Sequence, residues 1–162
     1  MPATLGMLRS LVADGELRAV AGTAFALTPV LRESYATGDT EELEYAAMTE
    51  AARASLRLLS VSLDSPEELP RRVVVSADVD GVRLRPDLDD GAVTLPGPVP
   101  MGLVAAAHVD LSDAEAAVRA AVAVVDDADL GDPDAEFALG TSEAHELAWY
   151  ATQELPFLLE LL

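Results

Sequence analysis

The stretch DTEELEYAAMTEAARASLRLLSVS, residues 39–62, says most about the fold. Asp39, followed three residues later by Glu42, is an acidic form of the capping box that begins a helix. Apolar side chains then recur at helical spacing along one stripe. We expect a helix of about five turns that buries this one face. The stripe consists of Leu43, Ala47, Ala51, Ala54, Leu58 and Val61.

Two shorter helices are predicted ahead of this stretch. Thr4 is placed to cap an apolar stripe that Gly15 ends, and Thr28 with Pro29 is typical of a helix start. Between these helices, residues 23–28 (TAFALT) are compatible with a strand.

After residue 62 the pattern changes to that of strands. Residues 71–79 (RRVVVSADV) are rich in β-branched side chains, and Asp80-Gly81 predicts a hairpin turn into residues 82–85. Residues 92–95 form a short candidate strand. The apolar run at 103–109 (LVAAAHV) is read as a buried strand, with a helix as the alternative because alanine suits both.

The last third is expected to alternate helices with an acidic loop. Ser112 and Glu115 form a capping box for a helix that reaches Val125. Residues 126–136 (DDADLGDPDAE) read as the loop, residues 137–139 as a short strand, and residues 141–155 as a helix ended by proline. This order of helices and strands predicts one α+β domain over residues 1–162. We expect a single mixed sheet of about four to five short strands, with helices packed against one face.

Composition restricts the partners and the chemistry. The 162 residues carry 10 Lys and Arg against 29 Asp and Glu, a net charge of −19, so phosphate backbones and anionic lipid surfaces repel the chain. It has no cysteine and two histidines, which excludes thiolate chemistry and a three-histidine zinc site. We expect no nucleic-acid partner, no membrane partner, no cofactor and a cytoplasmic location.

The HELAWY segment, residues 145–150, concentrates the candidate site residues. On a helix, His145 and Trp149 would lie on one border of the buried face and Tyr150 on the other, with Glu146 in solvent. His145 and Glu146 match the start of the zinc-protease motif HExxH, but Trp149 stands where the second histidine belongs. The segment is either the edge of a pocket or a pair of side chains that seals the core.

A second candidate is His108, two residues before Asp110 at the end of the predicted buried strand. His108 and His145 together with a carboxylate would allow a metal site. The simpler interpretation is that His108 is a strand residue that faces solvent or pairs with a neighbouring carboxylate. The acidic run at 126–136 offers oxygen ligands but lacks the EF-hand spacing, so we expect no metal. Arg32 is a further weak ligand-binding candidate.

Several segments together resemble an uncharacterised family of small proteins from high-GC bacteria, a domain of unknown function. The similarity covers nearly the whole chain and rests on PATLGML, TAFALTPVLRESY, EELEYAAMTEAARASLRLL, RRVVVSADV and HELAWYATQELP, above all on the patterns TPxLRExY and HELxWYxTQE. The resemblance implies a fold family and no catalytic residue. Members tend to begin with a short β-type segment that ends in a PAT-like triplet, whereas Met1 here runs straight into Pro2. Either this strand is missing, which would leave one sheet position open, or the start of the chain was assigned late.

The leading hypothesis is a small acidic protein-interaction or regulatory domain without catalysis, whose partner has a basic surface. The alternative is an enzyme or small-ligand-binding domain with a pocket around His145, Trp149 and Tyr150. The apolar tail, residues 157–162, should dock on its own domain or on a second copy. If it leaves the open sheet position uncovered, a homodimer through the tail is the expectation.

Overall fold

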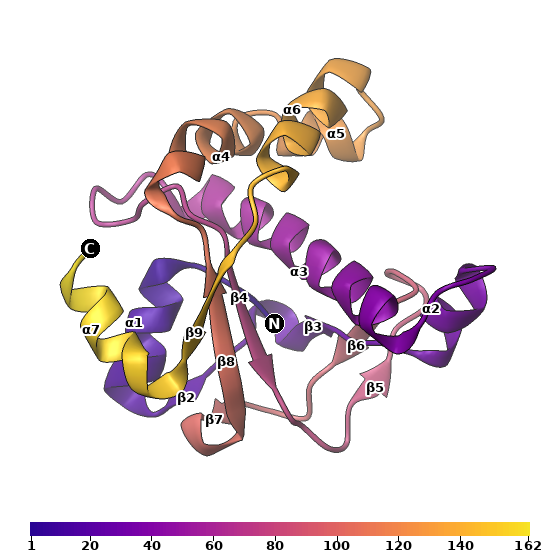
Figure 1. Cartoon of the computed structure of the whole chain (residues 1–162), viewed down its shortest axis with the longest axis horizontal. Helices are drawn as coiled ribbons and strands as arrows, with labels where there is room; N and C mark the ends of the chain where they lie inside the picture. The colour runs from indigo at the N-terminus through magenta and orange to yellow at the C-terminus, as the bar shows by residue number, and fades with distance from the viewer.

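The computed structural model describes residues 1–162 and contains nine strands and seven α-helices (Figure 1). The strands are β1 (Pro2–Ala3), β2 (Glu16–Leu17), β3 (Thr23–Phe25), β4 (Val73–Ala77), β5 (Arg83–Leu84), β6 (Ala92–Thr94), β7 (Val99–Pro100), β8 (Val104–Val109) and β9 (Ala148–Ala151). The helices are α1 (Leu5–Asp14), α2 (Pro29–Ser34), α3 (Thr40–Ser62), α4 (Glu115–Val122), α5 (Val125–Asp129), α6 (Pro133–Glu143) and α7 (Leu155–Glu160). None of the helices has the length and apolar composition required to cross a bilayer.

The strands form three small sheets instead of the expected single mixed one. Sheet A has four strands in the order β1-β4-β8-β9, β2 pairs with β7, and β3, β6 and β5 form the third sheet. Every pairing is antiparallel. The predicted hairpin between residues 71–79 and 82–85 is wrong, because β5 pairs with β6 and β4 pairs with β1 and β8.

The helix starts in the first third follow from local chemistry and are confirmed. Thr4 accepts a hydrogen bond from the Met7 N–H at 3.3 Å, and Thr28 accepts one from Leu31 N–H at 3.0 Å. Both halves of the capping box between Asp39 and Glu42 are present. These hydrogen bonds satisfy N–H groups that the first helical turn leaves without an intrahelical partner.

The buried face of α3 departs from the predicted stripe after Ala51. Leu58 is only half-buried and Val61 is 79% exposed, whereas Leu56 and Leu59 are fully buried. The reason is that the second half of α3 packs against α4, α5 and α6, which cover another side of the helix. The core of this half therefore lies at Ala52, Ser55, Leu56 and Leu59.

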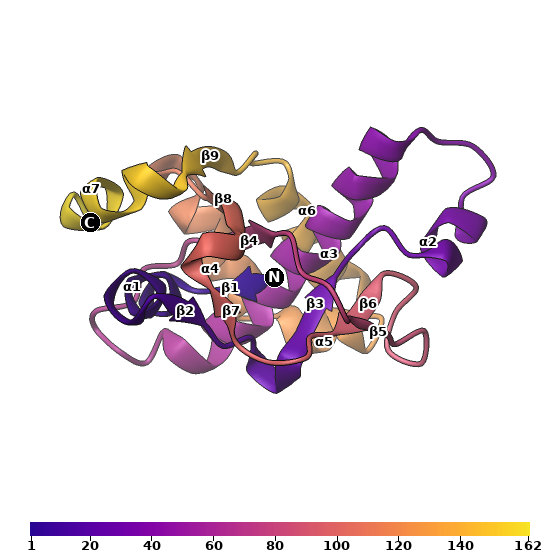
Figure 2. The ribbon, with the colours of Figure 1, turned by 90° about the horizontal axis from the view of Figure 1, so that it is seen from below.

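Helices cover both faces of sheet A, and not one face as predicted (Figures 1 and 2). Helices α1 and α7 pack on one face in a cluster of 16 buried residues that includes Leu8, Leu11 and Val75. Helix α3 lies on the other face, where Ala51 and Val74 meet. We name these the α1 face and the α3 face.

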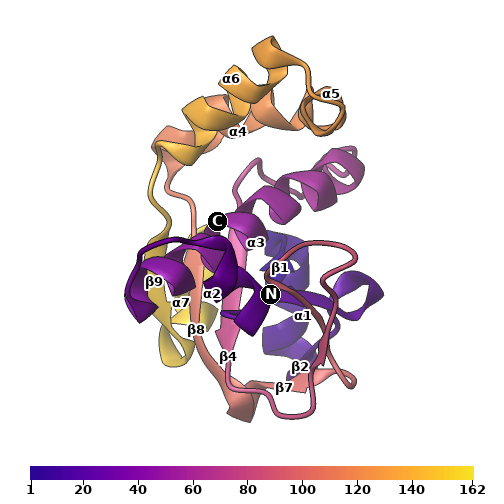
Figure 3. The ribbon, with the colours of Figure 1, turned by 90° about the vertical axis from the view of Figure 1, so that its right-hand side faces the viewer.

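Helices α4, α5 and α6 form a layer on α3, at one end of the molecule (Figure 3). The predicted acidic loop at 126–136 is wrong, because α5 and the start of α6 occupy it and Asp132 caps α6. Residues 137–139 belong to α6 and not to a strand. Residues 148–151 are β9 and not the middle of a helix, since they pair with β8.

The two ends of the chain lie on different parts of sheet A. The tail docks on its own domain, which is one of the two predicted outcomes: Leu158, Leu159 and Leu162 pack against the main core, and α7 contacts α1. Phe157 and Leu161 remain 68% and 85% exposed. At the other end, β1 and Met1 pair with Val73, Val74 and Val75 along one edge of β4, and the tail adds no strand to this sheet.

Candidate binding surface

Two hollows lie along the first half of α3, on the α3 face of sheet A. Hollow A, about 740 Å³, is bounded by α3, β4 and the β3–β6 pair. Hollow B, about 440 Å³, lies between α3 and the segment that joins α6 to β9. Tyr45 and Met48 line both hollows and form the ridge between them.

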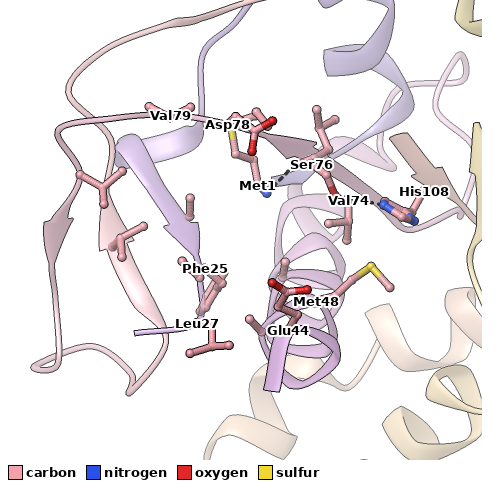
Figure 4. A pocket seen from close by; sticks show the side chains of 18 of the residues that line it. Met1, Phe25, Leu27, Glu44, Met48, Val74, Ser76, Asp78, Val79 and His108 are labelled. Carbon is pink, nitrogen blue, oxygen red and sulfur yellow. Dashed lines mark hydrogen bonds between the residues drawn. The ribbon is translucent and has the colours of Figure 1, made fainter. Parts of the chain in front are cut away.

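Hollow A is mainly apolar. Of its 21 lining residues 16 are hydrophobic, which favours an apolar occupant over a charged one. Phe25 and Leu27 line the side formed by β3 and the residues after it, and Met48 lies on the α3 side (Figure 4). Two of its acidic side chains, those of Glu44 and Asp78, are exposed.

A serine and a histidine meet at one end of hollow A. Ser76 on β4 and His108 on β8 are diagonal neighbours on the α3 face, and the Ser76 Oγ lies 3.0 Å from the His108 Nε2 (Figure 4). Burial lowers the pKa of His108 and so favours the neutral ring. Ser76 is the ring's only hydrogen-bond partner. The pair lacks the acid that orients the base in a catalytic triad.

The amino group of Met1 lies at the inner end of hollow A. It donates a hydrogen bond to the Val75 carbonyl at 2.7 Å, and Met1 as a whole is 8% exposed. Burial lowers the pKa of this amine from 8.0 to about 5, so it is neutral at pH 7. Because the amine is uncharged, the folded state does not bear the energetic cost of a buried, unpaired charge.

The floor of hollow B is held by a buried ion pair. The Nε and Nη2 of Arg72 donate to the two carboxylate oxygens of Asp110 at 2.8 and 2.7 Å, and both side chains are almost completely buried. Nη2 also donates to the carbonyl oxygen of His145 at 2.7 Å. Arg72 is therefore neutralised by Asp110, and it fixes the segment that leads into β9.

The structure separates the candidate site residues that the sequence grouped. His145 and Glu146 line hollow B. Trp149 is 61% exposed on the α3 face, directly across from His108. Tyr150 points to the opposite face, where it packs against the main core. The three side chains His145, Trp149 and Tyr150 therefore do not surround one pocket.

The other candidates are also dispersed. Arg32 is exposed on α2 and lines neither hollow. Asp110 is committed to Arg72, and no three His, Asp or Glu side chains gather as metal ligands. In the acidic run, Asp129 pairs with Arg57, whose hydrogen bonds lower the pKa of that carboxyl.

Sequence reasoning missed Tyr45, Met48, Ser76 and Arg72. Tyr45 and Met48 are three residues apart, beside the predicted apolar stripe of α3, so they occupy a border of its buried face. Arg72 begins an otherwise apolar strand and Asp110 ends another. A charge of each sign at the ends of two buried strands was the available signal for their pairing.

The comparisons with known proteins agree with the resemblance. A model of a family of unknown function, DUF6912, matches residues 1–159. No curated protein and no solved structure matches the chain. Since the family model covers the α1 face, both hollows and the segment with His145 and Trp149, the chain belongs to the family of unknown function DUF6912.

Proposed function

We propose that the chain is a cytoplasmic protein-binding module without catalysis that holds its partner on one surface of the α3 face. This surface, the Tyr45–Trp149 surface, consists of Tyr45, Met48, Leu147, Trp149 and hollow B. The partner supplies an apolar or aromatic anchor flanked by Arg or Lys. The observation that carries the proposal is a pair of exposed aromatic side chains on one side of the molecule, one of which, Tyr45, lines a hollow that also holds the exposed Glu146.

The aromatic side chains have the properties of interface anchors. Tyr45 is 59% exposed and Trp149 is 61% exposed, although both could bury large apolar areas. Trp149 shares the α3 face with His108, and His108 lines hollow A together with Tyr45, so the two aromatics belong to one side of the molecule. Trp and Tyr are enriched among residues that dominate binding energy.

The charges around hollow B select the partner's flanks. Glu146 is exposed in its lining, Glu143 lines it while paired with Arg53 at 3.1 Å, and Glu44 is exposed near Tyr45 on α3. The one guanidinium in the lining, that of Arg72, is neutralised by Asp110. With a net charge of −19, the chain attracts basic segments over a distance and repels acidic ones.

A peptide-display selection tests the proposal. Random peptides selected on the wild-type chain should be enriched in Arg or Lys on both sides of an apolar residue. The selected peptides should lose about tenfold or more in affinity for Tyr45→Ala and for Trp149→Ala. The matched control is Phe137→Ala, which removes an aromatic side chain that is 78% exposed on α6, away from both hollows.

Two outcomes would contradict the proposal. One is a selection without basic enrichment. The other is a set of peptides that bind Tyr45→Ala and Trp149→Ala as tightly as the wild-type chain, or that lose affinity equally for Phe137→Ala.

A further inference from the structure

The last strand of sheet A has a free outer edge. The strand order is β1-β4-β8-β9, so β9 has a neighbouring strand on one side only, and Figure 2 shows it at the margin of the molecule. Natural edge strands often carry a charged residue or a proline that blocks pairing with another chain. The sequence of β9, AWYA, contains neither. The outer edge of β9 can therefore accept a further strand.

The hydrogen-bond ladder shows which backbone groups lie on this edge. At the end of β8, the Asp110 N–H donates to the Arg72 carbonyl at 3.1 Å, which fixes the phase of the ladder between β8 and β4. His108, two residues earlier, therefore also bonds toward β4. Trp149 lies opposite His108, so its N–H and C=O point away from β8. No other strand, loop or side chain forms a hydrogen bond with these two groups.

The free part of the edge ends at Ala151. The Ala151 N–H lies on the same edge as that of Trp149, but it donates to the Glu154 carboxylate at 2.7 Å. In the other direction the edge continues from Trp149 to Leu147, which lines hollow B. An added strand would therefore pair around Trp149 and continue along hollow B.

The charges at both ends of β9 are negative. Glu146 precedes the strand and Glu154 follows it, and both are exposed. Residues 145–162 contain three Glu and neither Lys nor Arg. A strand with Arg or Lys at both ends fits this edge, whereas a second copy of β9 would bring the same carboxylates and be repelled.

The side chains on the α3 face favour an apolar residue in the middle of the added strand. Leu147 packs against the cluster between α3 and β4, and Trp149, two residues further on, is 61% exposed on the same face. In an antiparallel pair, the residue opposite Trp149 points its side chain to this face and lies beside the indole. An apolar side chain there would cover part of the indole that is now in solvent.

We propose that the partner is an extended basic segment that adds to β9 as the fifth strand of sheet A. It runs antiparallel to β9, the more stable direction and that of every pairing in this molecule, and it exchanges two hydrogen bonds with Trp149. Backbone hydrogen bonds supply affinity in this mode of binding, and alternate side chains supply specificity. The proposal rests on the proposed function and adds to it the form in which the partner binds.

A synthetic peptide and two N-methylated forms test this mode of binding. The peptide is acetyl-Arg-Arg-Val-Thr-Leu-Thr-Val-Arg-Arg-amide, with its leucine on the side of Trp149. One form is methylated on the leucine nitrogen, whose N–H would face β9, and the other on the preceding threonine nitrogen, whose N–H would face solvent. In calorimetry, methylation of the leucine nitrogen should weaken binding about tenfold or more, and methylation of the threonine nitrogen about twofold or less.

Hydrogen exchange of the full chain gives a second measurement at the edge itself. The saturating basic peptide should slow exchange of the Trp149 amide by about tenfold or more. The Tyr150 amide, which faces β8, is the internal control and should change little. The acidic peptide acetyl-Glu-Glu-Val-Thr-Leu-Thr-Val-Glu-Glu-amide should bind about tenfold more weakly or not at all.

Equal losses of affinity for the two methylated peptides would overturn the proposal, as would a Trp149 amide that millimolar basic peptide leaves unprotected. Protection of this amide that grows with chain concentration in the absence of peptide would also overturn it, since the edge would then belong to a second copy. Display-selected peptides that depend on Tyr45 and Trp149 but leave the Trp149 amide unprotected would overturn the strand proposal alone. Failure of the proposed function is recognised separately, by a selection without basic enrichment.

Discussion

The α1 face and the α3 face belong to the same four strands but differ in how they are covered. On the α1 face, Val73, Val75, Ala107 and Val109 join a cluster of 16 buried residues. On the α3 face, the strands contribute Val74 to a cluster of three, and the other positions include the polar or exposed Ser76, His108 and Trp149. Since apolar burial supplies most of the stability, the α1 face contributes more to holding the fold together, and the α3 face carries the surface that we propose binds a partner.

Removing the Arg72–Asp110 pair should have the largest effect on stability, because both side chains are almost completely buried. Asp110→Ala leaves the Arg72 guanidinium buried and unpaired, and should cost about 3 to 5 kcal/mol of unfolding free energy. Asp113→Ala, an exposed carboxylate three residues further on, is the control and should change stability by about 0.5 kcal/mol or less. Urea denaturation measures both. Equal urea midpoints for Asp110→Ala and Asp113→Ala would show that the ion pair contributes nothing to stability.

Acidification should weaken the inner end of hollow A. The Met1 amine has a pKa of 8.0 in the unfolded chain and about 5 in the fold. The unfolded state therefore binds more protons between these values, and stability falls as the pH is lowered from 8 toward 5, by about 4 kcal/mol at most.

Urea midpoints from pH 8 to 5 measure this loss, with intact-mass spectrometry to verify that Met1 is present. The control is a chain with Gly-Ser-Gly-Ser added before Met1, which has an amide in place of this amine and should lose less stability. The explanation fails if the two chains show the same pH dependence.

A pair of core truncations compares the two faces directly. Leu11→Ala on the α1 face removes a fully buried side chain and should cost about 2 to 5 kcal/mol. Met48→Ala should cost about 1 kcal/mol or less, because Met48 is half-buried and already borders two hollows. Equal losses in thermal or urea unfolding would mean that the α3 face is packed as firmly as the α1 face.

The smallest effect on stability is expected at the tail. Phe157 and Leu161 are exposed on α7, so replacing both with Ser should change stability by about 0.5 kcal/mol or less for each. We expect these side chains to join two copies of the chain, and the double variant should sediment as a monomer while the wild-type chain sediments as a dimer. A wild-type chain that stays monomeric at high concentration would show that the tail does not form a dimer interface.

Local chemistry explains which elements could be predicted. Thr4, Thr28 and Asp39 each cap a helix through hydrogen bonds within three residues, so α1, α2 and α3 are visible in the sequence. Strand β9 is not, although Trp149 and Tyr150 are of types that favour strands, because the apolar residues of this segment also fit helical spacing. Its extended form is imposed by pairing with β8, some forty residues away.

The same error explains what was missed at the candidate site. Read as a helix, residues 145–150 placed Trp149 and Tyr150 on two borders of one buried face. As a strand, the alternation of side chains sends them to opposite faces of sheet A. The hollows themselves are formed by segments far apart in the sequence, such as Tyr45 and Leu147, and no local pattern encodes that juxtaposition.

The emission of Trp149 tests the central claim, that the α3 face is the binding face, most directly. Trp149 is the only tryptophan of the chain, so its fluorescence reports on this surface alone. Titration with a selected basic peptide that lacks tryptophan should shift the emission to shorter wavelength in a saturable way, and Tyr45→Ala should weaken the apparent affinity by about tenfold or more. A peptide that binds with the same affinity by calorimetry but leaves the Trp149 emission unchanged would contradict the claim.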